Sequence, residues 1–149
     1  MCRILAAVPH EFTSHTADVA VELRAASREA LFAEALVAFT DTVTDPGRVE
    51  PAGEYELEVE ARDLESLLVE WLGELVYRFE VDGLLFREAA VEIGDGPEGL
   101  RLTARARGEP YDEERHPLKV QVKGVTYHEL EVRRDDETGG WFARVVLDI

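Results

Sequence analysis

The sequence predicts an α+β fold in which two helices pack on a mostly antiparallel or mixed β-sheet. Two segments carry apolar residues at helical spacing, and the other apolar residues alternate with polar ones, as in half-buried strands. The chain has 149 residues, of which 46% are hydrophobic, so it is long enough to bury one core without disulfides. We therefore expect one folded domain.

Two strands are predicted before the first helix. An edge strand is expected at His10–Thr13, and residues 19–25 alternate strictly between apolar and polar. Ser27 is a suitable N-cap, because its hydroxyl can accept hydrogen bonds from the free N–H groups of a first helical turn. The helix should run to about Val43 and end at the breaker sequence Asp45-Pro46-Gly47.

The second helix gives the strongest periodic signal in the chain. A strictly alternating strand is expected before it, at Glu54–Ala61. Asp63 is placed to cap the helix, and Asp82-Gly83 should end it. Apolar residues recur at helical spacing between these limits: Leu64, Leu67, Leu68, Trp71, Leu72, Leu75, Val76 and Phe79.

The C-terminal part is predicted as a series of strands. The expected strands are residues 89–93, 100–106, 119–132 and 141–147. A turn at 94–99, a polar loop at 111–117 and a turn at 135–140 separate them. The polar residues that follow Gly124 take the apolar parity of their strand, which predicts a β-bulge at this glycine.

The formal net charge of -16 argues against direct binding of free nucleic acid, because phosphates attract basic proteins. Such acidity favours a basic protein partner, cations or simply solubility. A single cysteine, Cys2, excludes an internal disulfide and fits the reducing cytoplasm. The apolar stretch at residues 1–8 is too short for a signal sequence or a membrane span.

Carboxylates at the ends of two predicted strands form a candidate metal site. By parity, Asp18 and Asp148 lie opposite the expected core face of their strands, and Ile149 adds the terminal carboxylate. If the first and last strands meet, these oxygens gather at one edge. Hard oxygen ligands suit Ca²⁺ or Mg²⁺, and without a cation the carboxylates would repel one another. The simpler interpretation is a solvated edge.

Other polar residues have structural or functional interpretations. His15 lies close enough in sequence to orient Asp18 or to donate to Thr16. Lys123 is explained either as a solvated strand lysine or as a partner contact. We expect His10 and His116 at the surface and a hydrogen-bonded structural role for His128. The arginine stripe at Arg101, Arg105 and Arg107 should pair with glutamates of a neighbouring strand, and we find no phosphate-binding glycine loop.

Five segments of the chain resemble the archease family in order and spacing. They are HTAD at 15–18, DTVTDPGRVEP at 41–51, LLVEWLGELVYRF at 67–79, GEPYDEERHPLKVQVKGVTYH at 108–128 and GWFARVVLDI at 140–149. The resemblance implies an archease-like domain over residues 9–149 and an N-terminal extension at residues 1–8. Ser14 stands where the family usually has an acidic residue.

The resemblance implies an accessory protein rather than an enzyme. Archease promotes guanylylation of the RtcB-family tRNA-splicing RNA ligase, with GTP and Mn²⁺ held by the ligase, and so permits repeated turnover. The family's metal site matches Asp18, Asp148 and Ile149, and a family lysine matches Lys123. Lys123 and His15 are thus candidates for partner contact. The alternatives are a general chaperone or interaction module, suggested by the acidity, and a small metal-dependent hydrolase, suggested by the carboxylates.

Overall fold

The computed structural model describes residues 9–14 and 18–149. Its elements, in chain order, are β1 (His10–Ser14), β2 (Asp18–Ala25), α1 (Arg28–Val43), a 3-10 turn (Pro46–Arg48), β3 (Gly53–Ala61), α2 (Leu64–Asp82), β4 (Leu84–Gly96), β5 (Gly99–Pro110), β6 (Gly124–Arg134) and β7 (Trp141–Asp148).

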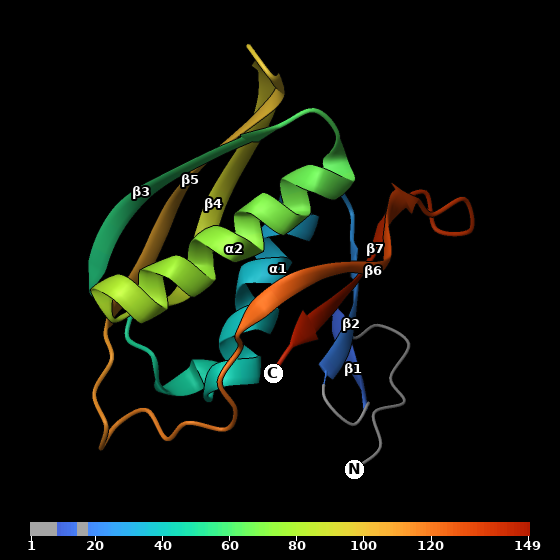
Figure 1. Cartoon of the computed structure of the whole chain (residues 1–149). Helices are drawn as coiled ribbons and strands as arrows, with labels where there is room; N and C mark the ends of the chain where they lie inside the picture. The colour runs from blue at the N-terminus through green and yellow to red at the C-terminus, as the bar shows by residue number, and fades with distance from the viewer. Residues whose placement is uncertain (1–8, 15–17) are drawn as a thin grey trace.

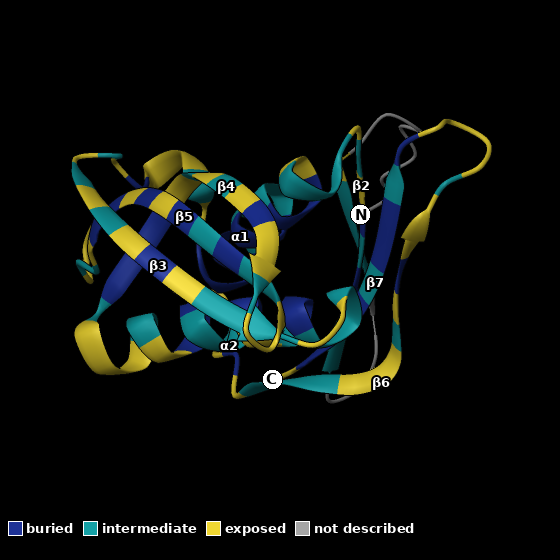
Figure 2. Ribbon diagram, turned by 90° about the horizontal axis from the view of Figure 1, so that it is seen from above, coloured by how far each residue is buried: buried dark blue, intermediate teal, exposed yellow. Residues whose placement is uncertain are grey.

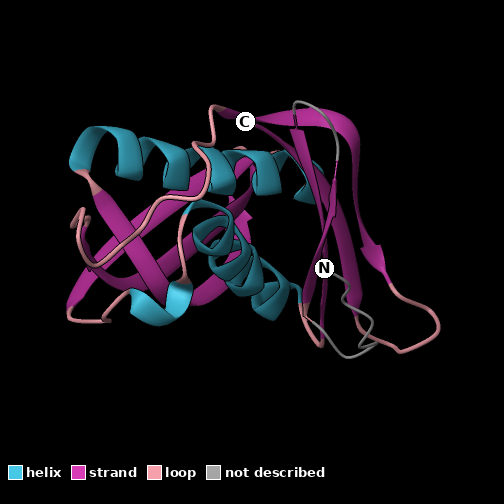
Figure 3. Ribbon diagram, turned by 90° about the horizontal axis from the view of Figure 1, so that it is seen from below, coloured by secondary structure: helices cyan, strands magenta, loops and turns pink. Residues whose placement is uncertain are grey.

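The strands form two antiparallel sheets that share the two helices. One sheet has the order β1-β2-β7-β6 and the other the order β3-β5-β4. Helix α1 contacts β4 of the smaller sheet and β2 of the larger one, and α2 contacts β3 and β6 (Figures 1 and 3). The predicted α+β class is confirmed. The alternation of apolar and polar residues did not predict that the strands divide into two sheets.

Both helices begin and end where the sequence predicts. The Ser27 hydroxyl accepts from the Ala30 N–H at 3.0 Å, and the Asp63 carboxylate accepts from the Ser66 N–H at 2.8 Å. Gly83 ends α2 in the left-handed conformation with φ 66°, which glycine adopts without steric cost. No helix in the described part of the chain is long and apolar enough to cross a membrane.

The core lies between the helices and the inner faces of both sheets. Trp71 of α2 has no exposed surface, and its indole N–H donates to the Phe32 carbonyl of α1 at 2.8 Å. This contact joins the two helices and satisfies the polar atom of the buried ring. In the larger sheet, β7 is buried along most of its length, whereas β6 is largely exposed (Figure 2).

The strand predicted at residues 119–132 is wrong in its first part. Strand β6 begins only at Gly124, because the preceding segment starts at the end of α1, where the Lys119 N–H donates to the Val43 carbonyl at 2.8 Å, and reaches β7 only at Lys123. Val122 of this segment is 4% exposed, which explains its strand-like apolar pattern. The irregularity predicted at Gly124 lies instead between Thr126 and Glu131.

Strand β7 is buried on both faces, contrary to the expected outward face. Phe142 is 5% exposed and Val146 is 2% exposed, although both share the parity of Asp148. The guanidinium groups of Arg24 and Arg133 cover the Phe142 ring, at 4.8 and 4.6 Å from its centroid. Long side chains from the two neighbouring strands can therefore cover the outer face of a central strand. For this reason the apolar–polar alternation did not show which residues of β7 reach solvent.

Candidate metal site at the chain terminus

The structure brings Asp18 and Asp148 together across two strands. Strand β2 begins at Asp18 and β7 ends at Asp148, and the two residues are direct partners in the antiparallel register. Residues directly opposite in such a pair have their Cβ atoms about 4.5–5.5 Å apart. The two carboxylates therefore start from neighbouring positions at one end of the sheet.

Neither carboxylate is neutralised by the part of the chain that the structure describes. Asp148 is exposed and Asp18 is half-exposed, and neither forms an ion pair with a described residue. Two anions at facing positions repel each other, so a cation between them lowers the energy of the ionised pair. The arrangement consequently favours binding of a positive charge.

Ile149, whose main-chain carboxylate is the third ligand of the predicted site, follows Asp148 at the same edge. The Ile149 side chain is half-buried and packs against the core cluster, so the residue that carries this carboxylate is held in place. Across residues 9–14 and 18–149, no group of three or more His, Cys, Asp or Glu side chains is arranged to hold a metal ion. The fit to a metal therefore depends on the two aspartates and the main-chain carboxylate, a set of hard oxygens that suits Ca²⁺ or Mg²⁺.

Lys123 lies beside these carboxylates. Its N–H donates to the Asp148 carbonyl at 2.7 Å, and the next residue, Gly124, is the register partner of Asp148 in β6. Lys123 is exposed and forms no ion pair with any described residue. Lys119, by contrast, donates its ammonium group to Asp41 at 3.0 Å. Among the residues that the structure describes, Lys123 is therefore an unpaired cation beside Asp148.

The histidines depart from their predicted positions. His15 lies outside the described residues. His116 is completely buried rather than at the surface, and the side chain of His10 is only 11% exposed. His128 is exposed, and its ring lies 3.6 Å from Glu129, beyond hydrogen-bond distance, so the described residues do not give its ring the expected hydrogen bond. Acidic partners make the burial of both rings possible. His10 contacts Glu34 and Asp41 on α1, and His116 contacts Glu109 at the end of β5.

Glu109 and His116 form a buried polar pair that sequence analysis missed. The Asp112 N–H donates to His116 Nδ1 at 2.8 Å, so Nε2 carries the proton and donates to Glu109, also at 2.8 Å. Glu109 further accepts from Arg115 at 2.6 Å and from the Glu50 N–H at 2.8 Å. Periodicity gives no signal for a contact between a strand end and a loop.

These donors set the ionisation of Glu109. Burial alone raises the pKa of this carboxyl, but hydrogen bonds from Arg115, the Glu50 N–H and His116 outweigh it and lower the pKa to about 2. Glu109 is therefore a fixed anion. It anchors the loop from which the chain runs on to Lys123.

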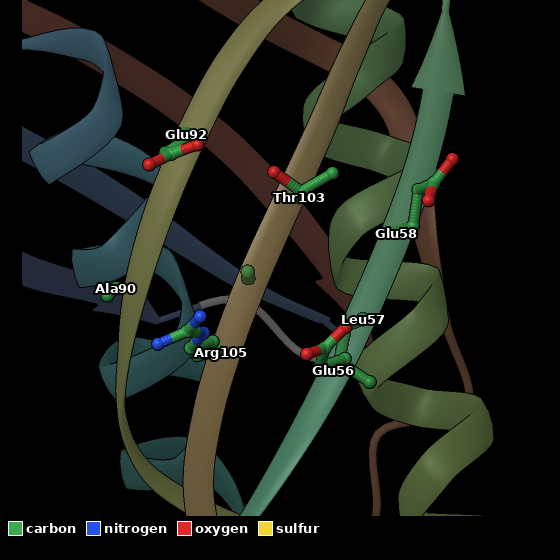
Figure 4. A pocket seen from close by; sticks show the side chains of 8 residues that line it. Glu56, Leu57, Glu58, Ala90, Glu92, Thr103 and Arg105 are labelled. Carbon is green, nitrogen blue, oxygen red and sulfur yellow. The ribbon is translucent and has the colours of Figure 1, made fainter.

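A separate hollow lies on the outer face of the β3-β5-β4 sheet. It has a volume of about 500 Å³, and its lining includes Glu56, Glu58, Glu92, Thr103 and Arg105 (Figure 4). Arg105 is the register partner of Glu56 on β3 and of Ala90 on β4, and no residue of the lining is a cysteine, serine or histidine. Thr103 is the one hydroxyl of this lining, and no hydrogen bond joins it to a carboxylate of the described residues.

Sequence comparison relates the chain to a known family. The sequence profile of the archease protein family (MTH1598/TM1083) matches residues 10–149. This chain belongs to the archease family. An archease of Methanopyrus kandleri is 44% identical over 142 residues, which cover 95% of this chain and 100% of that protein. An archease of Pyrococcus abyssi is 37% identical over 139 residues, covering 93% of this chain and 97% of that protein.

Solved structures agree with this archease fold. The solution structure of protein 1598 from Methanobacterium thermoautotrophicum has a TM-score of 0.79 and 34% identity, covering 95% of this chain and 99% of the other. The crystal structure of a Thermotoga maritima archease, described there as a possible chaperone, has a TM-score of 0.58 over the whole of both chains. Its 19% identity supports the archease fold alone.

Proposed function

We propose that this archease is a metal-binding accessory protein that activates an RtcB-type RNA ligase in tRNA splicing or RNA repair. One observation supports the proposal above others: Asp18 and Asp148 face each other beside the terminal carboxylate of Ile149, and Lys123 bonds to the main chain of Asp148. These are the four residues for which the resemblance to archease implies a function. The ligase itself carries out guanylylation and strand joining.

In this proposal the chain binds and orients rather than catalyses. Asp18, Asp148 and the Ile149 carboxylate would hold one divalent cation, Ca²⁺ or Mg²⁺, at the end of the sheet. When bound, the cation offsets the facing carboxylates and can accept oxygen ligands from a partner. Lys123 would contact the ligase beside it. The main-chain bond from Lys123 to Asp148 fixes the spacing between this lysine and the carboxylates.

The proposal is tested by ligation with limiting ligase, with and without this protein, alongside calorimetric titration of Ca²⁺ and Mg²⁺. Asp18→Ala and Asp148→Ala should remove both metal binding and activation while leaving the fold intact, because each change also removes repulsion. Lys123→Ala should reduce activation and leave metal affinity unchanged. Residues added after Ile149 should weaken metal binding, because the terminal carboxylate becomes an amide.

Asp136→Ala is the matched control, because Asp136 is an exposed aspartate in the turn between β6 and β7. It should behave as the unmodified protein in both assays. Full activation by folded Asp18→Ala and Asp148→Ala proteins would show that the carboxylates are only a solvated edge. Covalent guanylate on this protein itself would contradict its accessory role.

A general chaperone or interaction module is the second candidate, suggested by the net charge of -16. It predicts that the protein suppresses aggregation of unrelated unfolded proteins in the absence of ligase. The proposed activator should not do so, and Asp148→Ala should have no effect in that aggregation assay. Suppression that does not depend on Asp148 would support the chaperone.

A further inference from the structure

A groove of about 360 Å³ runs between α2 and the start of β6. Its lining is Val69, Glu70, Gly73, Glu74, Tyr77 and Val125. In the sheet, Val125 pairs with Leu147, and the preceding Gly124 pairs with Asp148. One end of the groove therefore lies one register position from Asp148. Because successive side chains of a strand point to opposite faces, the groove and the Asp148 carboxylate lie on the two faces of the same end of the sheet.

The fold itself does not require a glycine at position 73. It lies in the middle of α2, and glycine is among the least favourable residues in a helix interior. Its φ is not positive, and a Cβ built on Gly73 would meet no atom within 4 Å. Neither backbone conformation nor packing inside the chain requires glycine here. The missing side chain instead leaves open space in the groove.

The lining indicates the chemistry of an occupant. Val69 and Val125 contribute apolar surface, and Tyr77 is 53% exposed although large aromatic residues are usually buried. Glu74 pairs with Arg78 at 2.8 Å, whereas Glu70 forms no ion pair with a described residue. The lining contains no lysine or arginine. A complementary segment carries an aliphatic side chain next to a lysine or arginine.

The larger hollow on the β3-β5-β4 sheet is a weaker candidate. Arginines and glutamates of its strands already pair with each other, as Arg101 does with Glu60 at 2.9 Å and Arg107 with Glu88 at 3.6 Å. An antiparallel sheet commonly leaves one such face to solvent. The hollow (Figure 4) also belongs to the sheet that contains neither Asp18 nor Asp148.

We infer that the groove between α2 and β6 is a docking surface for a basic, partly aliphatic segment of the ligase, with the open space over Gly73 receiving its aliphatic side chain. This inference rests on the proposed function and adds a second contact area to the terminal carboxylates. The groove supplies apolar and electrostatic affinity, and the terminal site supplies activation. A partner would thus be held at two places, one on each face of this end of the sheet.

The test is Gly73→Leu, which fills the groove from a helical position that favours leucine over glycine. The variant should fold and unfold at the same or a higher temperature. Its Ca²⁺ affinity should be unchanged. The concentration needed for half-maximal ligase activation should rise roughly tenfold or more, as for loss of a central interface contact. Glu70→Lys should raise it too, by charge repulsion.

Gly94→Leu is the matched control. It adds the same side chain at another glycine with no atom within 4 Å of a Cβ, on β4 of the smaller sheet. It should activate like the unmodified protein. If Asp148→Ala abolishes activation but Gly73→Leu activates at the normal concentration, the groove is wrong and the proposed function stands. If the unmodified protein neither binds nor activates the ligase, both proposals are wrong.

Discussion

Glu109 holds a negative charge with only 8% of its side chain exposed. Three donors make this possible: the Arg115 guanidinium on one carboxylate oxygen, and the His116 ring and the Glu50 N–H on the other. A buried charge is expensive unless its lone pairs are satisfied. The residue consequently ties the loop after β5 to the segment before β3, and its own conformation depends on all three partners.

Glu109→Gln should lower the free energy of unfolding by about 1–3 kcal/mol, because one amide N–H₂ must then face a hydrogen-bond donor. Urea denaturation at neutral pH measures this change. Glu113→Gln, an exposed glutamate in the same loop, serves as the control and should leave stability nearly unchanged. Equal stability of the two variants would contradict the role of the buried pair.

The contribution of Glu109 to stability should disappear at acid pH. The pKa of Glu109 is about 2 in the folded protein, against an ordinary value of 4.5. A lowered folded pKa gives stability that is complete above pH 4.5 and lost as pH falls toward about 2. Unmodified protein should therefore lose more stability than Glu109→Gln across this range, and parallel losses would exclude the assignment.

At the scale of elements, β1 is held by one strand and one polar cluster. It pairs only with β2 in the sheet order. The His10 ring contacts the carboxylates of Glu34 and Asp41 on α1, the second at 3.1 Å. Asp41 in turn accepts from Lys119 at 3.0 Å. The edge strand and the segment before β6 are thus attached to the same helix through one aspartate.

The attachment of β1 should weaken as pH rises above 6.5. Burial lowers the pKa of His10, but hydrogen bonds and opposite charge from Glu34 and Asp41 outweigh it and raise the pKa. A raised folded pKa gives stability that is complete below the ordinary value of 6.5 and lost as pH rises through the folded value. After correction for intrinsic exchange rates, amide protection of β1 should fall over this range.

His10→Gln provides the control, because it keeps a hydrogen-bonding side chain without a titrating ring. Protection of β1 in this variant should not depend on pH near neutrality. An NMR titration of the His10 ring offers an independent measurement. A midpoint below 6.5 would contradict the raised pKa.

At the scale of the whole molecule, the surface charge is strongly negative. The net charge is -16, and two arginines of the stripe on β5 are paired with glutamates: Arg101 with Glu58 and Glu60, and Arg107 with Glu88. This confirms the pairing expected from the sequence for those two residues. The stripe thus offers little free positive charge to a phosphate backbone.

The protein alone should not bind free tRNA at physiological salt. Binding needs positive groups that replace counterions along the phosphates, and the net charge opposes this. A gel-shift titration measures it, with the ligase as a positive control. Salt-sensitive retardation of tRNA by this protein in the absence of ligase would contradict the prediction.

The sequence by itself determined the local elements. Caps at Ser27 and Asp63 and the left-handed stop at Gly83 depend on residues within one turn of each helix end, so their positions follow from short-range chemistry. The fold class followed from apolar periodicity, and the candidate site followed from carboxylates at the two ends of the chain together with the family resemblance.

Only the tertiary structure decided which strands are neighbours, because pairing depends on contacts between residues far apart in sequence. That pairing places Asp18 opposite Asp148 and brings the Lys123 N–H to the Asp148 carbonyl. It buries Phe142 on the face that was expected to be exposed to solvent. It also buries His116 against Glu109 and leaves Gly73 beside an open groove. None of these contacts has a periodic signature, because each joins an element to a segment whose position the rest of the fold sets.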